Sequence, residues 1–198
     1  MSESPRRPRF RTQKQETVPS SPAELFYKLG QPEKTHEYPR GPQQDALRDY
    51  LALDPSVTDV AVELPTGTGK TAAGLLIAEW HRRKGRGRAA YLALTNQLAK
   101  QVLAEAARLG LQCANLIGTK YTRDSAEEGK CRAGEAVAVT SYSNLFNVNP
   151  VIQQSEVLLL DDAHGGEHYV CDNWTVRVTR SEEPALFESE SRSSTTSG

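Results

Sequence analysis

The sequence contains few cysteines, and their placement excludes two common uses of this residue. Cys113, Cys131 and Cys171 are the three cysteines of the 198-residue chain, and no two of them have CxxC spacing. An odd number of cysteines does not fit a disulfide framework, and isolated cysteines do not fit a structural zinc site. We therefore expect a protein of a reducing, cytoplasmic compartment that folds without disulfide bonds.

Long hydrophobic runs are also missing. No segment approaches the roughly 18 consecutive apolar residues of a transmembrane helix. Residues 1–15 (MSESPRRPRFRTQKQ) lack the apolar centre of a secretory signal. Hydrophobic residues make up 37% of the chain and charged residues 25%, which is a globular balance. The composition predicts a soluble protein with no membrane partner.

The chain has almost no net charge, at −1, so any affinity for nucleic acid must come from a local basic surface. Residues 1–21 are polar, proline-rich and basic, which predicts a flexible arm. Its cluster of arginines is either a tail that touches nucleic acid or a solvated leader. Residues 181–198 are of low complexity and predict a disordered tail. The remaining residues, 22–180, are expected to form one domain.

Short apolar runs alternate with segments of helical periodicity between these two ends. Continuous apolar runs of this length are typical of strands that are buried on both faces, and helices between them indicate a parallel sheet. The sequence therefore predicts an α/β fold with helices on both faces of the sheet. The predicted strands are 57–64, 89–94 and short runs within 111–117, 135–141 and 156–162, and the predicted helices include 70–83 and 97–109, the latter capped by Asn96.

A glycine-rich turn, LPTGTGKT at residues 64–71, joins the first predicted strand to the first of these helices. Gly67 and Gly69 permit a tight turn whose amides face an anion, and the helix N-terminus adds a positive field. In a loop of this kind, Lys70 reaches the β- and γ-phosphates of a nucleotide and the hydroxyl of Thr71 binds Mg²⁺. Leu64 replaces the first glycine of the strict GxxxxGK[ST] pattern. The segment nevertheless predicts a phosphate-binding loop, with Thr68 among its residues.

Two carboxylates, Asp161 and Asp162, follow the apolar run 157–160. Ligands of parallel sheets bind at the carboxyl ends of the strands, where this pair is expected to lie. Asp161 is predicted to bind Mg²⁺, and Asp162 to orient the water that attacks the γ-phosphate. Taken alone the pair is more typical of a solvated turn after an edge strand, so the interpretation depends on the phosphate loop upstream.

These motifs and their order resemble the superfamily 2 helicases, the DEAD/DEAH-box-like group, across residues 38–169. ELPTGTGKT is similar to the first motif of that family, and DDAH (161–164) is similar to the second. The family contacts a bound nucleic-acid strand with two segments, and these resemble YLALTNQLAKQ and VTSYSNL in this chain. Gln43, in RGPQQDALRDYL, resembles the glutamine that reads adenine, although its neighbour Gln44 is an alternative.

The resemblance implies a RecA-like domain that binds ATP and Mg²⁺ and couples hydrolysis to movement on DNA or RNA. It places His164 where the family couples hydrolysis to nucleic-acid binding. It also implies that one set of residues contacts the strand: Thr95, Asn96, Gln97, Thr140, Ser141 and Tyr142.

The chain departs from the family pattern at three of these positions. Asp162 stands where a glutamate is usual, which shortens the side chain that would face the attacking water. Leu94 replaces a customary proline, and Asn96 replaces an arginine. We therefore expect altered hydrolysis geometry and different contacts to the strand.

The family's third motif is not found after DDAH, and no second RecA-like unit follows. We therefore expect a fragment that lacks the second motor domain and leaves a gap in its sheet between 57–64 and 157–160. The alternating segment 174–180 (WTVRVTR) is one candidate to fill that gap. Two other functions stay open. One is another P-loop enzyme such as a nucleotide kinase, and the other is an inactive module that binds nucleotide or nucleic acid.

Overall fold

The computed structural model describes residues 18–30, 41–85, 87–147, 150, 152, 154–174 and 181. The predicted arm and tail fall outside this part of the chain except for residues 18–21 and Ser181, and the segment 174–180 does so except for Trp174. Described helices and strands follow one another in the order α1 (Pro22–Lys28), α2 (Gly41–Leu51), α3 (Lys70–Arg83), β1 (Ala89–Ala93), α4 (Asn96–Leu109), β2 (Cys113–Asn115), α5 (Ser125–Arg132), β3 (Val137–Ser141), the 3₁₀ turn η1 (Tyr142–Asn144), β4 (Val157–Leu160) and α6 (Ala163–Trp174).

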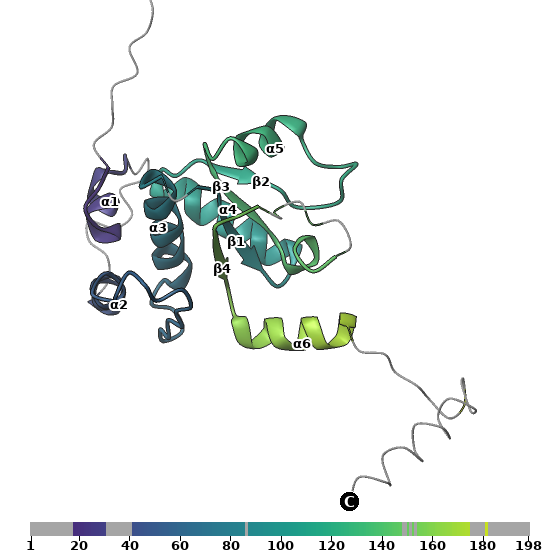
Figure 1. The fold of residues 1–198 in the computed structure, drawn as a ribbon, viewed down its shortest axis with the longest axis horizontal. Helices are drawn as coiled ribbons and strands as arrows, with labels where there is room; N and C mark the ends of the chain where they lie inside the picture. The colour runs from purple at the N-terminus through teal and green to yellow at the C-terminus, as the bar shows by residue number, and fades with distance from the viewer. Residues whose placement is uncertain are drawn as a thin grey trace, which may run out of the picture.

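The four strands form one parallel sheet in the order β2-β3-β1-β4, which confirms the predicted α/β class (Figure 1). Tyr91 lies at the centre of the sheet, where it is in register with Val139 of β3 and Leu159 of β4. Strands β1 and β3 are buried along their whole length, as their continuous apolar sequences predict. The arrangement is that of an incomplete RecA-like domain.

The two faces of the sheet carry separate hydrophobic clusters. Helices α3 and α4 cover one face, and α1 and α2 pack on the outside of α3 (Figure 1). On the opposite face α5 packs against β2, and the buried ring of Tyr142 belongs to the second cluster together with Ile152 and Cys131. Coverage of both faces was predicted from the uniform apolar content of the strands.

The amino-terminal residues of the described chain are firmly attached to this core. The indole nitrogen of Trp80, in α3, donates a hydrogen bond of 3.0 Å to the carbonyl of Pro19. Leu25 and Phe26 of α1 are buried against the same cluster, at 0% and 4% exposure. Ser21 caps α1 by accepting a hydrogen bond from the amide of Glu24.

One predicted strand is wrong. Residues 57–63 form no strand and are exposed, and only Leu64 is buried. A strand needs a partner for its backbone groups, and β4, the last strand of the described sheet, does not pair with this segment. Val57, Val60 and Val62 consequently keep between 40% and 47% of their surface exposed. The apolar sequence is suited to a strand, but the described chain supplies no neighbour for it.

Two smaller differences concern element boundaries and burial. Thr95, rather than the predicted Asn96, caps α4, and its hydroxyl accepts a hydrogen bond of 3.2 Å from the amide of Leu98. Strand β4 was predicted to be buried on both faces, but Leu158 and Leu160 are each 43% exposed. Helix α3 spans the residues predicted for it. In the described chain, no helix combines the length and the apolar character that crossing a membrane requires.

Candidate functional site

The glycine-rich turn leads directly into helix α3, as its sequence predicts. Gly67 and Gly69 have φ angles of 78° and 86°, in the left-handed region that glycine adopts without strain. The hydroxyl of Thr68 donates a hydrogen bond of 2.6 Å to the carbonyl of Pro65, which closes the turn. Lys70, the first residue of α3, is exposed. The helix N-terminus therefore opens toward solvent, where an anion can approach its amides.

Gln43 lies against this turn although 26 positions separate it from Gly69. Its side-chain nitrogen donates a hydrogen bond of 2.9 Å to the carbonyl of Gly69. A Cβ at position 69 would overlap the amide of Gln43, so the close approach depends on glycine. Gln43 is 9% exposed, whereas Gln44 points to solvent. Of the two glutamines considered, the structure places Gln43 beside the turn.

A cavity of about 610 Å³ brings five of the predicted site residues together, whereas Thr68, Lys70, Asp162 and His164 do not line it. Gln43, Gly67, Gly69, Thr71 and Asp161 all line it, and they come from helix α2, the turn, helix α3 and the end of β4. Helix α4 contributes the opposite wall. Phe26 of α1 adds an aromatic ring to the lining. The size is within the range of small-molecule sites.

The hydroxyl of Tyr91 joins the two predicted magnesium ligands. It lies near the side chains of Thr71 and Asp161, of which Thr71 lowers the pKa of Tyr91 and Asp161 raises it. Burial and the negative charge of Asp161 raise the pKa of Tyr91, so the phenol stays protonated and can act as a hydrogen-bond donor toward the carboxylate. Burial also raises the pKa of Asp161, while Tyr91 and Lys70 act in the opposite direction. Thr71, Tyr91 and Asp161 thus form one connected polar group.

Helix α3 makes room for the Tyr91 ring at Gly74. A Cβ at this position would come within 3.0 Å of the Tyr91 ring and of Leu159. Glycine inside a helix is less stable than alanine by about 0.5–1 kcal/mol, so its presence here has a packing reason. Sequence reasoning missed Tyr91. The available signal was a polar aromatic residue in the middle of an otherwise aliphatic strand.

The turn after β4 is held in an unusual backbone conformation. Asp162 has a φ angle of 53°, which aspartate tolerates better than most residues. One of its carboxylate oxygens accepts a hydrogen bond of 3.3 Å from the amide of Gly165 at the start of α6. His164 is exposed, and its ring makes an edge contact with that of His168. Asp162 is exposed as well, so both side chains are accessible to a ligand.

The two segments predicted to contact a nucleic-acid strand differ in how exposed they are to solvent. Thr95, Asn96 and Gln97 are exposed at the N-terminus of α4. Thr140, Ser141 and Tyr142, by contrast, are buried at 0%, 2% and 0% exposure. These three residues are therefore not accessible in this arrangement, and their contact with a nucleic-acid strand stays a prediction.

The buried segment instead links other parts of the site. The hydroxyl of Ser141 donates a hydrogen bond of 2.8 Å to the side-chain oxygen of Asn96. The hydroxyl of Tyr142 donates one of 3.0 Å to the backbone carbonyl of Asp161. Ser141 therefore connects this segment to the start of α4, and the adjacent Tyr142 connects it to the acidic turn after β4.

The fold and the connected motifs define an α/β domain with a phosphate-loop cavity at the carboxyl end of its sheet. The family model of the DEAD/DEAH box helicase matches residues 40–172, and the chain belongs to this family. Searches among curated proteins and among solved structures found no match. The family relationship supports the helicase-like motifs and a nucleotide-binding domain in which nucleic-acid interaction is expected.

Replacing Gln43 by alanine is expected to weaken ATP binding about 3- to 10-fold. The substitution removes the hydrogen bond to Gly69, and such bonds contribute about 0.5–1.5 kcal/mol. Gln44→Ala is the matched control because it removes the same side chain from an exposed position one residue away. Calorimetric titration with ATP would measure both. Equal affinities of the two variants would contradict a role for Gln43 in the nucleotide cavity.

Proposed function

We propose that this domain binds Mg²⁺–ATP in the 610 Å³ cavity and hydrolyses it in response to nucleic acid. The observation that carries the proposal is the convergence of Gln43, the glycine-rich turn and Asp161 on one cavity. These residues lie far apart in the sequence, and a shared lining is what nucleotide binding requires of them. The parent activity would be movement on DNA or RNA coupled to hydrolysis.

The side chains present suit a magnesium nucleotide. Thr71 and Asp161 offer hydroxyl and carboxylate oxygens, the donor types that Mg²⁺ prefers, and both line the cavity. They would hold the ion. When it is bound, its positive charge would offset the negative charge of the β- and γ-phosphates. Lys70 and the amides at the start of α3 would bind the phosphates directly. Asp162 would orient the attacking water.

Two hydrogen bonds support the proposed coupling to nucleic acid. The Tyr142 hydroxyl contacts the carbonyl of Asp161, and neighbouring Ser141 contacts Asn96 at the exposed start of α4. A nucleic-acid strand bound at Thr95–Gln97 can therefore change the position of the turn at Asp161 through the hydrogen bonds of Ser141 and Tyr142. A nucleotide kinase has no need for this connection, so the observation favours a nucleic-acid-dependent ATPase over that alternative.

Single-stranded RNA or DNA is expected to raise the ATP hydrolysis rate of the chain, and phosphate release would measure the effect. Asp161→Asn keeps the size of the side chain but removes the charge that would hold Mg²⁺, so its rate is expected to fall at least about 100-fold, the scale of lost electrostatic stabilisation. Hydrolysis that ignores the strand would favour another P-loop enzyme. Nucleotide binding without any turnover would favour an inactive module.

A further inference from the structure

The buried hydroxyl of Tyr91 is not explained by packing alone. The other residues of β1 are alanines and a leucine, and Tyr91 is 1% exposed. A phenylalanine would fill the same space without burying a hydroxyl group. Buried hydroxyls are normally hydrogen-bonded, because leaving one without a partner is unfavourable. The surroundings of this hydroxyl therefore indicate what Tyr91 does.

The ring of Tyr91 points toward helix α3. Tyr91 is in register with Leu159 of the neighbouring strand β4. A Cβ at Gly74 of α3 would come within 3.0 Å of both side chains, so both lie on the face of the sheet that α3 covers. The missing side chain at Gly74 thus leaves the space that the ring occupies beneath the helix.

Thr71 and Asp161 lie on the same side of the sheet as the ring. Thr71 precedes Gly74 in α3 by about one helical turn, so the two residues share a face of the helix. Asp161 is the second residue after Leu159, and alternate side chains of a strand project to the same face. The amide of Asp161 continues the strand pairing by donating a hydrogen bond of 2.8 Å to the carbonyl of Leu92. The fold thus brings the hydroxyl of Tyr91 near both side chains.

The electrostatic effects of these two neighbours agree with this geometry. Burial is the main cause of the raised pKa of Tyr91, and the neighbours act on it in opposite directions. Thr71 lowers the pKa, as a group that donates to the phenol oxygen does, whereas Asp161 raises it, as an acceptor of the phenol proton does. The hydroxyl of Tyr91 can therefore accept from Thr71 and donate to Asp161. In this arrangement the lone pairs of the Thr71 hydroxyl stay available to a cation.

Tyr91 does not line the nucleotide cavity, whereas Thr71 and Asp161 do. The phenol can therefore act on a bound ion only through these two residues. Mg²⁺ requires near-ideal octahedral geometry, so the orientation of each ligand oxygen affects the affinity for the ion. Removing a group that holds a metal ligand in place commonly lowers metal affinity by about 10- to 100-fold. Loss of the Tyr91 hydroxyl is expected to have an effect of this kind.

We propose that Tyr91 is a positioning residue for Mg²⁺: its hydroxyl holds the oxygens of Thr71 and Asp161 in the orientation that the ion requires. The inference rests on the proposed binding of Mg²⁺–ATP and deepens it, because it assigns a role to a residue outside the glycine-rich turn and the acidic pair. The ring reaches the two ligands because Gly74 has no side chain. The ion site is therefore prepared by β1 as well as by α3 and the end of β4.

Tyr91→Phe tests this role because it keeps the ring and removes only the hydroxyl. Calorimetric titration with a hydrolysis-resistant ATP analogue, once in Mg²⁺ and once in EDTA, measures how much affinity the ion adds. This gain is expected to fall about 10-fold or to disappear in Tyr91→Phe, the lower end of the effect of removing a group that holds a metal ligand. The affinity in EDTA is expected to stay unchanged, which also shows that the variant folds.

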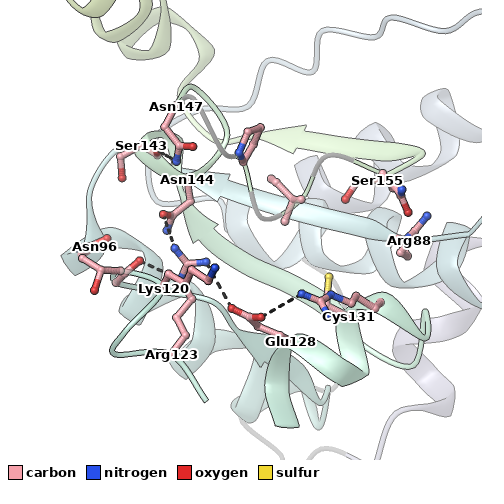
Figure 2. A pocket seen from close by; sticks show the side chains of 16 residues that line it. Arg88, Asn96, Lys120, Arg123, Glu128, Cys131, Ser143, Asn144, Asn147 and Ser155 are labelled. Atoms are coloured by element: carbon pink, nitrogen blue, oxygen red, sulfur yellow. Dashed lines mark hydrogen bonds and ion pairs between the residues drawn. The ribbon is translucent and has the colours of Figure 1, made fainter. Parts of the chain in front are cut away.

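Tyr50→Phe is the matched control. It removes the same atom from a tyrosine of α2 whose hydroxyl is hydrogen-bonded to the ring of His81 at 2.6 Å and which does not line the nucleotide cavity. Ser155→Ala is a second control, because it removes a buried hydroxyl that lines a separate hollow of about 1030 Å³ (Figure 2). That hollow shares no lining residue with the nucleotide cavity. Both controls are expected to keep the full gain from Mg²⁺.

The proposal is overturned if Tyr91→Phe keeps the full gain, or if Tyr50→Phe loses as much of it as Tyr91→Phe does. It is also overturned if Tyr91→Phe weakens binding equally in Mg²⁺ and in EDTA, because the hydroxyl would then support the cavity as a whole. If the unchanged chain does not bind the analogue, or gains no affinity from Mg²⁺, the proposed function itself fails. If the unchanged chain shows the gain and Tyr91→Phe shows it equally, only the role of Tyr91 fails.

Discussion

Alanine at position 70 is expected to lower the affinity for ATP about 10- to 150-fold. Lys70 starts helix α3 beside the cavity, and its charge opposes the rise that burial causes in the pKa of Asp161. Its ammonium group would form a charge-assisted hydrogen bond with a phosphate oxygen, and the loss of one such contact costs about 1.5–3 kcal/mol. Calorimetric titration of ATP into the two proteins would measure the change directly.

Lys100→Ala provides the control for this experiment. Lys100 is an exposed lysine of α4 that does not line the nucleotide cavity, so its removal changes the net charge by the same amount. A general electrostatic effect would weaken ATP binding in both variants. The assignment of the glycine-rich turn as the phosphate site would be abandoned if Lys70→Ala bound ATP as tightly as Lys100→Ala did.

We also expect the chain to self-associate at micromolar concentrations, with β4 forming the contact between the chains. This strand is the last of the described sheet, and its outer edge has no strand partner among the described residues. Leu158 and Leu160 on it are each 43% exposed. Unpaired backbone groups together with exposed leucines favour pairing with another chain. Sedimentation velocity over a range of concentrations would detect the oligomers, and thermal unfolding is expected to be broad.

Replacing Leu158 and Leu160 together by lysine is expected to shift the chain to a monomer, since lysines on an edge strand repel a second copy. The matched control is Leu51→Lys with Leu53→Lys, because these leucines, at the end of helix α2 and just after it, are 44% and 40% exposed and belong to no strand. Equal solubilisation by both pairs would indicate general surface stickiness. A monomer with a sharp unfolding transition before any substitution would show that the edge is already protected.

The sequence predicted most of the central sheet because its strands are short, apolar and separated by periodic helices. Helix α3 begins and ends where predicted, since a glycine turn precedes it and basic residues close it. The segment 57–64 has the same local signals as the true strands but forms none. Strand formation depends on a neighbour in space, and no local pattern reports whether that neighbour exists. The strand prediction for residues 57–64 is therefore wrong because of tertiary structure and not because of the local sequence.

The motifs that supply the candidate site could be predicted from the sequence, but the contacts that connect residues of different motifs could not. Gln43 was one of two candidates, and only the fold shows that one side chain contacts Gly69 while the other faces solvent. Burial of Thr140 and Tyr142 was also outside the reach of motif reasoning, because a residue that resembles a contact in sequence can act from beneath the surface. Tyr91 was overlooked because its role depends on two partners from other elements.

The attachment of α1 changes where the working unit begins. The matched region starts at residue 40, yet Phe26 contributes to the wall of the nucleotide cavity and Pro19 is bonded to Trp80. A polypeptide trimmed to the matched region would lose that aromatic wall and uncover the side of α3 on which Leu25 rests. The boundary of sequence similarity and the boundary of the packed core are therefore different in this protein.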